Sequence, residues 1–134
     1  MNRNSVISGV ILIVLAIILG AFGAHALKEK LSVSDLQTFE VGIRYQMYCG
    51  IGLLVVGLSA QQLSFSLKPF LTLLILGSVL FSGSIYLLAM QDIFGMKLSF
   101  LGPVTPIGGL LMILGWILFL TKVLKMKETN KLEG

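Results

Sequence analysis

Six polar side chains near the ends of apolar segments are the residues of this sequence most suited to bind a small molecule. They combine an imidazole, a guanidinium, an amide and three hydroxyl groups: His25, Arg44, Tyr45, Gln46, Tyr86 and Thr105. Histidine titrates near neutral pH, so His25 would supply the titratable group of such a pocket. The alternative is structural, because polar side chains also join neighbouring helices by hydrogen bonds, and tyrosines commonly lie at headgroup depth.

Few residue types in the sequence suit catalysis. His25 and Cys49, the single histidine and the single cysteine, could form a base and nucleophile pair, but no carboxylate stands at a recognisable spacing to orient them. A lone cysteine forms no intrachain disulfide and no zinc cluster, and no glycine loop followed by Lys-Ser or Lys-Thr marks a phosphate site. We therefore expect no enzyme activity, no catalytic residue, no metal site and no cofactor.

Four long uncharged stretches must position these polar side chains. They are Asn4–Leu27, Tyr45–Leu67, Pro69–Gln91 and Leu98–Thr121. Each exceeds the roughly 20 residues that an α-helix needs to cross the hydrocarbon core of a bilayer. Charged residues make up 12% of the 134-residue chain, about half the usual fraction of a soluble domain. The sequence predicts an all-α fold, an integral membrane four-helix bundle.

We expect a single transmembrane domain at residues 1–125, with spans at about 5–25, 45–63, 69–90 and 102–122, and a charged cytoplasmic tail at 126–134. The first span has an alternative interpretation, because Ala24-His25-Ala26 imitates the cleavage site of a secretory signal. Its apolar run, Val6–Ala24, is nevertheless long enough to cross the membrane, so we favour a retained span.

The connection at residues 28–44 is predicted to contain a short amphipathic helix between the first and second spans. Four apolar residues fall on one helical stripe: Leu36, Phe39, Ile43 and Met47. Two capping boxes fit its start: Ser32 with Asp35, or Ser34 with Gln37. Glu40 and Arg44 are four residues apart and can pair on the helix surface. We expect this helix to lie at the membrane interface and to run into the second span.

The distribution of charge predicts the orientation of the spans. Four passes place both termini and the middle loop on one side, which holds six basic residues: Arg3, Lys68, Lys122, Lys125, Lys127 and Lys131. Glu128 and Glu133 reduce that side to a net charge of +4, whereas four acidic residues on the other side balance its four basic ones. Because basic loops stay in the cytoplasm, both termini are predicted to be cytoplasmic.

The same charges bear on partners. They lie in loops and tails rather than on one folded face, so we expect contact with anionic lipid headgroups and no binding of nucleic acid. A second copy of the chain or another membrane protein could also pack on the apolar surface.

Small residues form one face of each predicted span. These helix-packing positions are Ala16, Gly20, Ala24, Gly50, Gly57, Ser78, Ser82, Gly108 and Gly115. Within the first span, Ala16, Gly20 and Ala24 recur every four residues. Membrane helices associate by close packing, which small side chains permit. We therefore expect these faces to point into the bundle or into an oligomer interface, and the bulky aliphatic faces to contact lipid.

Four motifs in order relate the chain to a known family: Gly20-Ala-Phe-Gly-Ala-His-Ala-Leu27, Phe39-Glu-Val-Gly-Ile-Arg-Tyr-Gln-Met-Tyr48, Phe81-Ser-Gly-Ser-Ile-Tyr-Leu-Leu-Ala89 and Gly102-Pro-Val-Thr-Pro-Ile-Gly-Gly109, followed by Gly115-Trp116. With them, residues 5–121 resemble the small four-pass membrane proteins grouped as domain of unknown function 423. The resemblance implies a multi-pass plasma-membrane protein of a bacterium and brings no established activity. Cys49 stands where relatives usually carry a histidine, so the resemblance carries no metal site over to this chain. Val33 stands where we expect a proline.

The functional hypothesis from these observations is a non-enzymatic membrane protein with a structural or accessory role in membrane integrity or assembly. The alternative hypothesis is a small-molecule binding or transport protein with an outward-facing pocket among the six polar residues.

Overall fold

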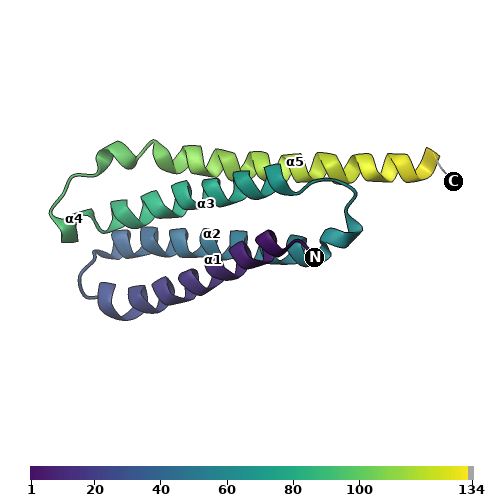
Figure 1. Cartoon of the computed structure of the whole chain (residues 1–134). Helices are drawn as coiled ribbons and strands as arrows, with labels where there is room; N and C mark the ends of the chain where they lie inside the picture. The colour runs from purple at the N-terminus through teal and green to yellow at the C-terminus, as the bar shows by residue number, and fades with distance from the viewer. Residues whose placement is uncertain (133–134) are drawn as a thin grey trace.

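The computed structural model describes residues 1–132, with side chains through residue 126, so most of the charged tail predicted at 126–134 lies outside the described side chains. Four helices are long and apolar enough to cross a membrane (Figure 1): α1 (Arg3–Phe22), α2 (Val33–Leu58), α3 (Lys68–Ala89) and α5 (Val104–Leu132). The shorter elements are a π-helix, η1 (Gly23–Leu27), two 3₁₀ turns, η2 (Ser59–Gln62) and η3 (Ser99–Leu101), and one turn of α-helix, α4 (Gln91–Phe94). The predicted all-α membrane fold is confirmed.

The predicted amphipathic helix forms the first turns of α2. The Ser32 hydroxyl accepts a hydrogen bond from the Asp35 backbone N–H at 3.1 Å and donates one to the Asp35 carboxylate at 2.7 Å, which caps the helix at the first of the two predicted starts. The predicted surface pair also forms, with 3.6 Å between Arg44 Nη2 and Glu40 Oε2. Because no proline follows, the segment continues into the second span as one helix of 26 residues.

Proline and glycine set two other helix boundaries. Pro69 lies in the first turn of α3, where the missing N–H costs no helical hydrogen bond. Gly95 follows α4 with a φ of +63°, in the left-handed region that other residues seldom adopt. The chain there reverses direction between α3 and α5 (Figure 1).

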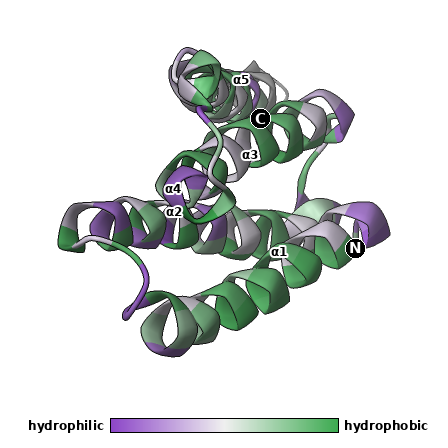
Figure 2. Cartoon of the chain, turned by 90° about the vertical axis from the view of Figure 1, so that its left-hand side faces the viewer, coloured by the Kyte–Doolittle hydropathy of each residue, from purple (hydrophilic) through white to green (hydrophobic). Residues whose placement is uncertain are grey.

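The four long helices pack in serial order. α1 packs on α2, α2 on α3 and α3 on α5, whereas α1 and α5 lie at opposite edges of the molecule (Figures 1 and 2). Each helix contains an apolar segment of 18 residues. In that segment 39% of the residues are buried in α2 and in α3, but only 17% in α1 and in α5. The bundle is therefore an open row, in which the two central helices are covered and the edge helices face their surroundings along most of their surface.

Glycines allow the closest helix crossings. A Cβ at Gly9 of α1 would lie 2.7 Å from the carbonyl oxygen of Gly50 in α2, and a Cβ at Gly77 of α3 would lie 2.8 Å from the carbonyl oxygen of Gly108 in α5. At these points two backbones are in direct contact, which no larger residue would permit.

Most of the predicted helix-packing positions are buried, but the pattern in α1 differs from the prediction. Ala16, Gly50, Gly57, Ser78, Ser82, Gly108 and Gly115 are buried, Gly20 is half-buried and Ala24 is exposed. In the N-terminal hairpin, Gly9, Ala16 and Gly23 are buried at intervals of seven residues, and Gly9 and Gly23 face α2. Paired helices that lie nearly parallel meet again every seven residues rather than every four, and the wider π-turn at Gly23–Leu27 shifts the faces beyond it.

Adjacent glycines in α5 allow a matched test of this packing. A Cβ at Gly108 would contact the backbone nitrogen of Phe81 and the carbonyl oxygen of Gly77, whereas a Cβ at Gly109 would meet the Phe81 ring at an ordinary 3.5 Å. We expect Gly108→Ala to lower the free energy of unfolding by about 1–3 kcal/mol. Gly109→Ala is expected to be neutral or slightly stabilising, since alanine favours the helix.

The single tryptophan, Trp116, packs on Phe70 of α3 with 5.0 Å between ring centroids, so its fluorescence reports this interface during denaturation by SDS in detergent. Equal stability of Gly108→Ala and Gly109→Ala would contradict the close α3–α5 crossing.

Candidate functional site

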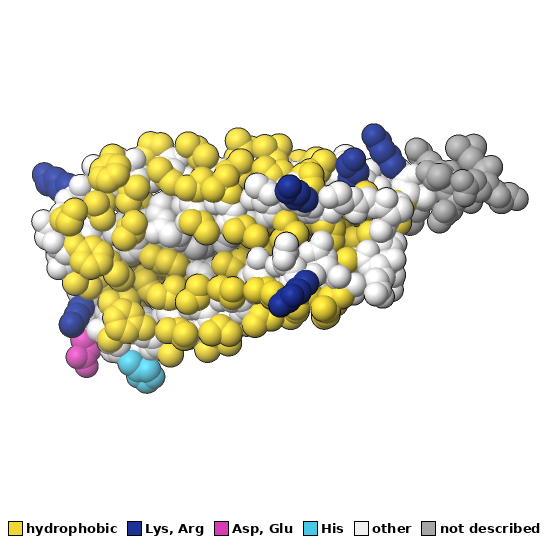
Figure 3. Space-filling view, in the orientation of Figure 1, with side chains coloured by type: hydrophobic (Ala, Val, Ile, Leu, Met, Phe, Trp, Pro, Cys, Tyr) yellow, Lys and Arg dark blue, Asp and Glu magenta, His cyan; other side chains and the backbone are white. Residues whose placement is uncertain are grey.

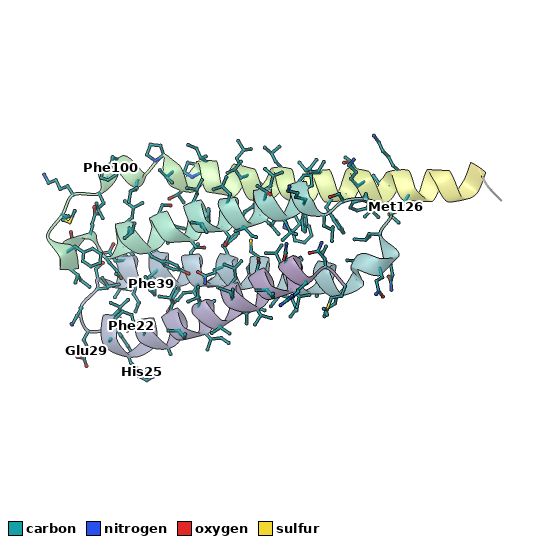
Figure 4. All side chains as sticks on the ribbon, viewed as in Figure 1. Phe22, His25, Glu29, Phe39, Phe100 and Met126 are labelled. Carbon is teal, nitrogen blue, oxygen red and sulfur yellow. The ribbon has the colours of Figure 1, made fainter. Side chains whose placement is uncertain are left out.

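The predicted pocket residues with formal or titratable charge lie on the surface. His25, in η1, is exposed and projects away from the other helices (Figure 4). The Arg44 guanidinium and its partner Glu40 are 58% and 53% exposed. Pairs this accessible contribute little to stability, because water screens them. Neither His25 nor Arg44 faces a cavity shared with the other predicted pocket residues.

Gln46 and Tyr86 are the two predicted pocket residues that contact each other. The Tyr86 hydroxyl donates to Gln46 Oε1 at 2.7 Å, and Gln46 Nε2 donates to the carbonyl oxygen of Leu12 at 3.0 Å. Gln46 is only 5% exposed, and Tyr86 also packs on the Phe39 ring with 4.9 Å between centroids. One buried amide in α2 thus joins α1, α2 and α3.

Tyr45 and Thr105 lie in two further places. Tyr45 is half-exposed on α2, and its ring packs on Phe81 with 4.9 Å between centroids. The hydroxyl oxygens of Thr105 and Ser84 are 2.6 Å apart and join the start of α5 to α3. The six predicted residues therefore do not line one cavity in this structure.

Serine side chains extend the pattern of bonds between helices. Ser5 Oγ of α1 donates to the carbonyl oxygen of Leu53 in α2 at 2.7 Å, and Ser82 Oγ of α3 donates to that of Gly42 in α2 at 2.8 Å. Each carbonyl has a second lone pair, so it can accept this bond as well as its helical one. Ser5 was not among the predicted packing residues, although it stands four residues before Gly9, on the same face of α1.

A buried group of sulfur and oxygen atoms occupies the centre of the molecule. Cys49 Sγ donates to Met112 Sδ at 3.2 Å. Ser78 Oγ has no hydrogen-bond partner of good geometry, although it lies near the Cys49 thiol. Among the described residues, no group of three or more His, Cys, Asp or Glu side chains lies close enough together to hold a metal ion.

Two grooves follow from the open order of the helices. The first lies between α2 and α5, has a volume of about 630 Å³, and is lined mainly by aromatic and aliphatic residues that include Tyr45, Phe81 and Trp116. The second lies between α1 and α3 and contains two adjoining cavities of about 470 and 300 Å³ that share Val79. The sequence did not indicate either groove, because periodicity assigns a face to a helix but does not identify its neighbours.

The two ends of the molecule differ in charge. The described acidic residues lie near the end opposite the termini, in the first turns of α2 or in the segments that join the long helices: Glu29, Asp35, Glu40 and Asp92. At the end where both termini lie, Figure 3 shows basic side chains without acidic ones on the visible face of the described part. Arg3, Lys68, Lys122 and Lys125 belong to this end.

Comparisons with known proteins agree with this membrane architecture. The model of a family described as "Protein of unknown function (DUF423)" matches residues 19–109. Among curated proteins, the UPF0382 membrane protein of Staphylococcus haemolyticus is 40% identical over 120 residues, which cover 90% of this chain and 94% of the relative. UPF0382 membrane protein YwdK of Bacillus subtilis is 41% identical over 122 residues, 90% of this chain and 95% of the relative.

No solved structure shows a significant match to this chain. The family model covers most of the chain, and the bacterial relatives align along nearly their whole length, which confirms the resemblance seen in the four sequence motifs. The chain is thus a multi-pass membrane protein and belongs to the DUF423 family.

Proposed function

We propose that this protein has a non-enzymatic accessory role in the bacterial plasma membrane, where it supports membrane integrity or the assembly of a partner. The observation that carries the proposal is the use of the buried polar groups. Ser5, Gln46 and Ser82 each donate to a backbone carbonyl of a neighbouring helix. In this proposal the packed helices are themselves the functional unit, because the polar chemistry of the spans serves to hold them together.

The alternative, an outward-facing pocket among the six predicted residues, has less support. Such a pocket needs side chains that converge on one space, and only Gln46 and Tyr86 are in contact. Both use their polar atoms on each other and on Leu12, which leaves little capacity for a ligand at that point.

In this proposal both termini of the protein lie in the cytoplasm. Support comes from the basic residues at the end where the termini lie, because basic segments are retained on the cytoplasmic side. The names of the relatives, which describe membrane proteins of bacteria, agree with a plasma-membrane location.

A deletion strain allows the accessory role to be tested. Uptake of a dye that intact cells exclude, and the amounts of membrane complexes on native gels, would be measured after complementation. We expect wild type and His25→Ala to restore both equally. Gln46→Leu with Tyr86→Phe is expected to restore less, in proportion to a fall in folded protein. Two lost bonds between helices, at about 0.6 kcal/mol each, should destabilise the fold by about 1 kcal/mol.

Failure of His25→Ala at a normal protein level would contradict the proposal, because it would assign a specific task to an exposed side chain. So would a deletion strain with wild-type dye exclusion and unchanged membrane complexes.

Matched serine variants test the orientation. Ser34 and Ser64 are both exposed, in α2 near its start and in the loop after η2 respectively. We expect a membrane-impermeant thiol reagent to label Ser34→Cys but not Ser64→Cys in intact cells, and to label both after permeabilisation. Cys49 is buried, so the parent protein is the unlabelled control. Labelling of Ser64→Cys alone in intact cells would reverse the proposed orientation.

A further inference from the structure

The groove between α1 and α3 runs along most of one face of the molecule. Its cavity nearer the termini is lined by Asn4 and Ser8 of α1 and by six residues of α3: Lys68, Leu71, Thr72, Ile75, Leu76 and Val79. The adjoining cavity continues from Val79 toward Tyr86. The two helices run in the same direction on either side of the groove and are both attached to α2 (Figure 1).

The end of this groove near the termini is polar and positively charged. Lys68 is exposed at the first position of α3, and Asn4 and Ser8 present an amide and a hydroxyl from α1. The Thr72 hydroxyl donates to the carbonyl oxygen of Lys68 at 2.9 Å, so it belongs to the same turn. The start of α3 adds a partial positive charge, since helix dipoles point their positive end toward the N-terminus.

The charges around this end favour an anionic partner. Arg3 precedes Asn4 directly, and no acidic residue with a described side chain lies at this end of the chain's fold. Each Lys or Arg side chain near the membrane surface adds a similar increment to the free energy of attraction for anionic lipids.

The rest of the groove suits an acyl chain. Its walls beyond the first turn are aliphatic and include Leu71, Ile75, Leu76 and Val79. Lys68 and Val79 are eleven residues apart, about 16 Å along a helix, and one leaflet contributes about half of the roughly 30 Å hydrocarbon core. The cavity of about 470 Å³ therefore has the length and the polarity gradient of one lipid chain below its headgroup.

We propose that the α1/α3 groove binds one anionic phospholipid from the leaflet at the terminal end. Its phosphate would lie against Lys68 and Asn4, with Arg3 adjacent, and one acyl chain would lie along the aliphatic wall of α3. A lipid is favoured over a free phosphate because the apolar wall would otherwise give no binding energy. The inference goes beyond the accessory role, since it names a ligand and a site that the role does not require.

Native mass spectrometry of protein released from lipid discs tests the headgroup contact. The discs would contain equal amounts of phosphatidylglycerol and phosphatidylcholine. We expect wild type to retain one phosphatidylglycerol, and Lys68→Gln to retain it about fivefold less, the effect expected of one basic residue near the headgroup. Lys68→Arg keeps the charge and should retain it. Lys97→Gln, at an exposed lysine of the opposite end, is the matched control.

Equal retention of the two lipids by wild type would overturn the proposal. An equal loss in Lys68→Gln and Lys97→Gln would also overturn it, since that result would indicate attraction to net charge only.

Substitutions at two valines test whether the acyl chain lies in the α1/α3 groove. Val79 in the groove and Val55 on α2 are 55% and 56% exposed, so a larger side chain at either position leaves the interior unchanged. We expect Val79→Trp to fill the groove and reduce phosphatidylglycerol retention at least fivefold, and Val55→Trp to retain the wild-type amount. Both variants should unfold at the wild-type SDS concentration. Equal retention by the two tryptophan variants would show that the lipid does not occupy this groove.

Discussion

The fold depends on one constraint, which is that the hydrocarbon core of a bilayer offers no water to polar groups. Each backbone N–H and C=O must be satisfied inside the protein, so the spans are helices. The same constraint applies to the buried side chains. Ser5, Gln46 and Ser82 satisfy theirs on backbone carbonyls of the next helix, which converts a cost of burial into a bond between helices.

Close contact supplies the rest of the attraction between helices. Lipid chains are as apolar as leucine, so burial of aliphatic surface alone does not draw membrane helices together. Gly9 and Gly50 bring α1 onto α2, and Gly77 and Gly108 bring α3 onto α5. The middle pair, α2 and α3, is joined by the bonds from Gln46 and Ser82 as well as by packing. The hydrogen bonds of Gln46 and Ser82 therefore help to hold the two helical hairpins together.

The open row of helices distinguishes this fold from a closed bundle. A closed bundle would cover each helix on two sides, whereas here α1 and α5 each pack on one long neighbour and leave grooves over α2 and α3. Both grooves lie along helices that are long and apolar enough to cross a membrane. The α1/α3 groove has Lys68 at its end near the termini, whereas the residues that line the α2/α5 groove carry no charge.

Sequence alone determined the features that depend on neighbouring residues in the chain. Runs without charge predicted the four helices, Ser32 with Asp35 was one of two predicted starts of α2, and the spacing of Glu40 and Arg44 predicted their ion pair. These follow from hydropathy and helical periodicity, which act over a few residues.

Only the tertiary structure decided which polar side chains meet. Gln46 and Tyr86 are 40 residues apart and in contact, while His25 points away from both. Periodicity assigns a side chain to a helix face, but the order of the helices and the π-turn before Lys28 decide what that face contacts. The α1/α3 groove has the same origin, because its two walls come from segments that share no local pattern and are brought together only by their common packing on α2.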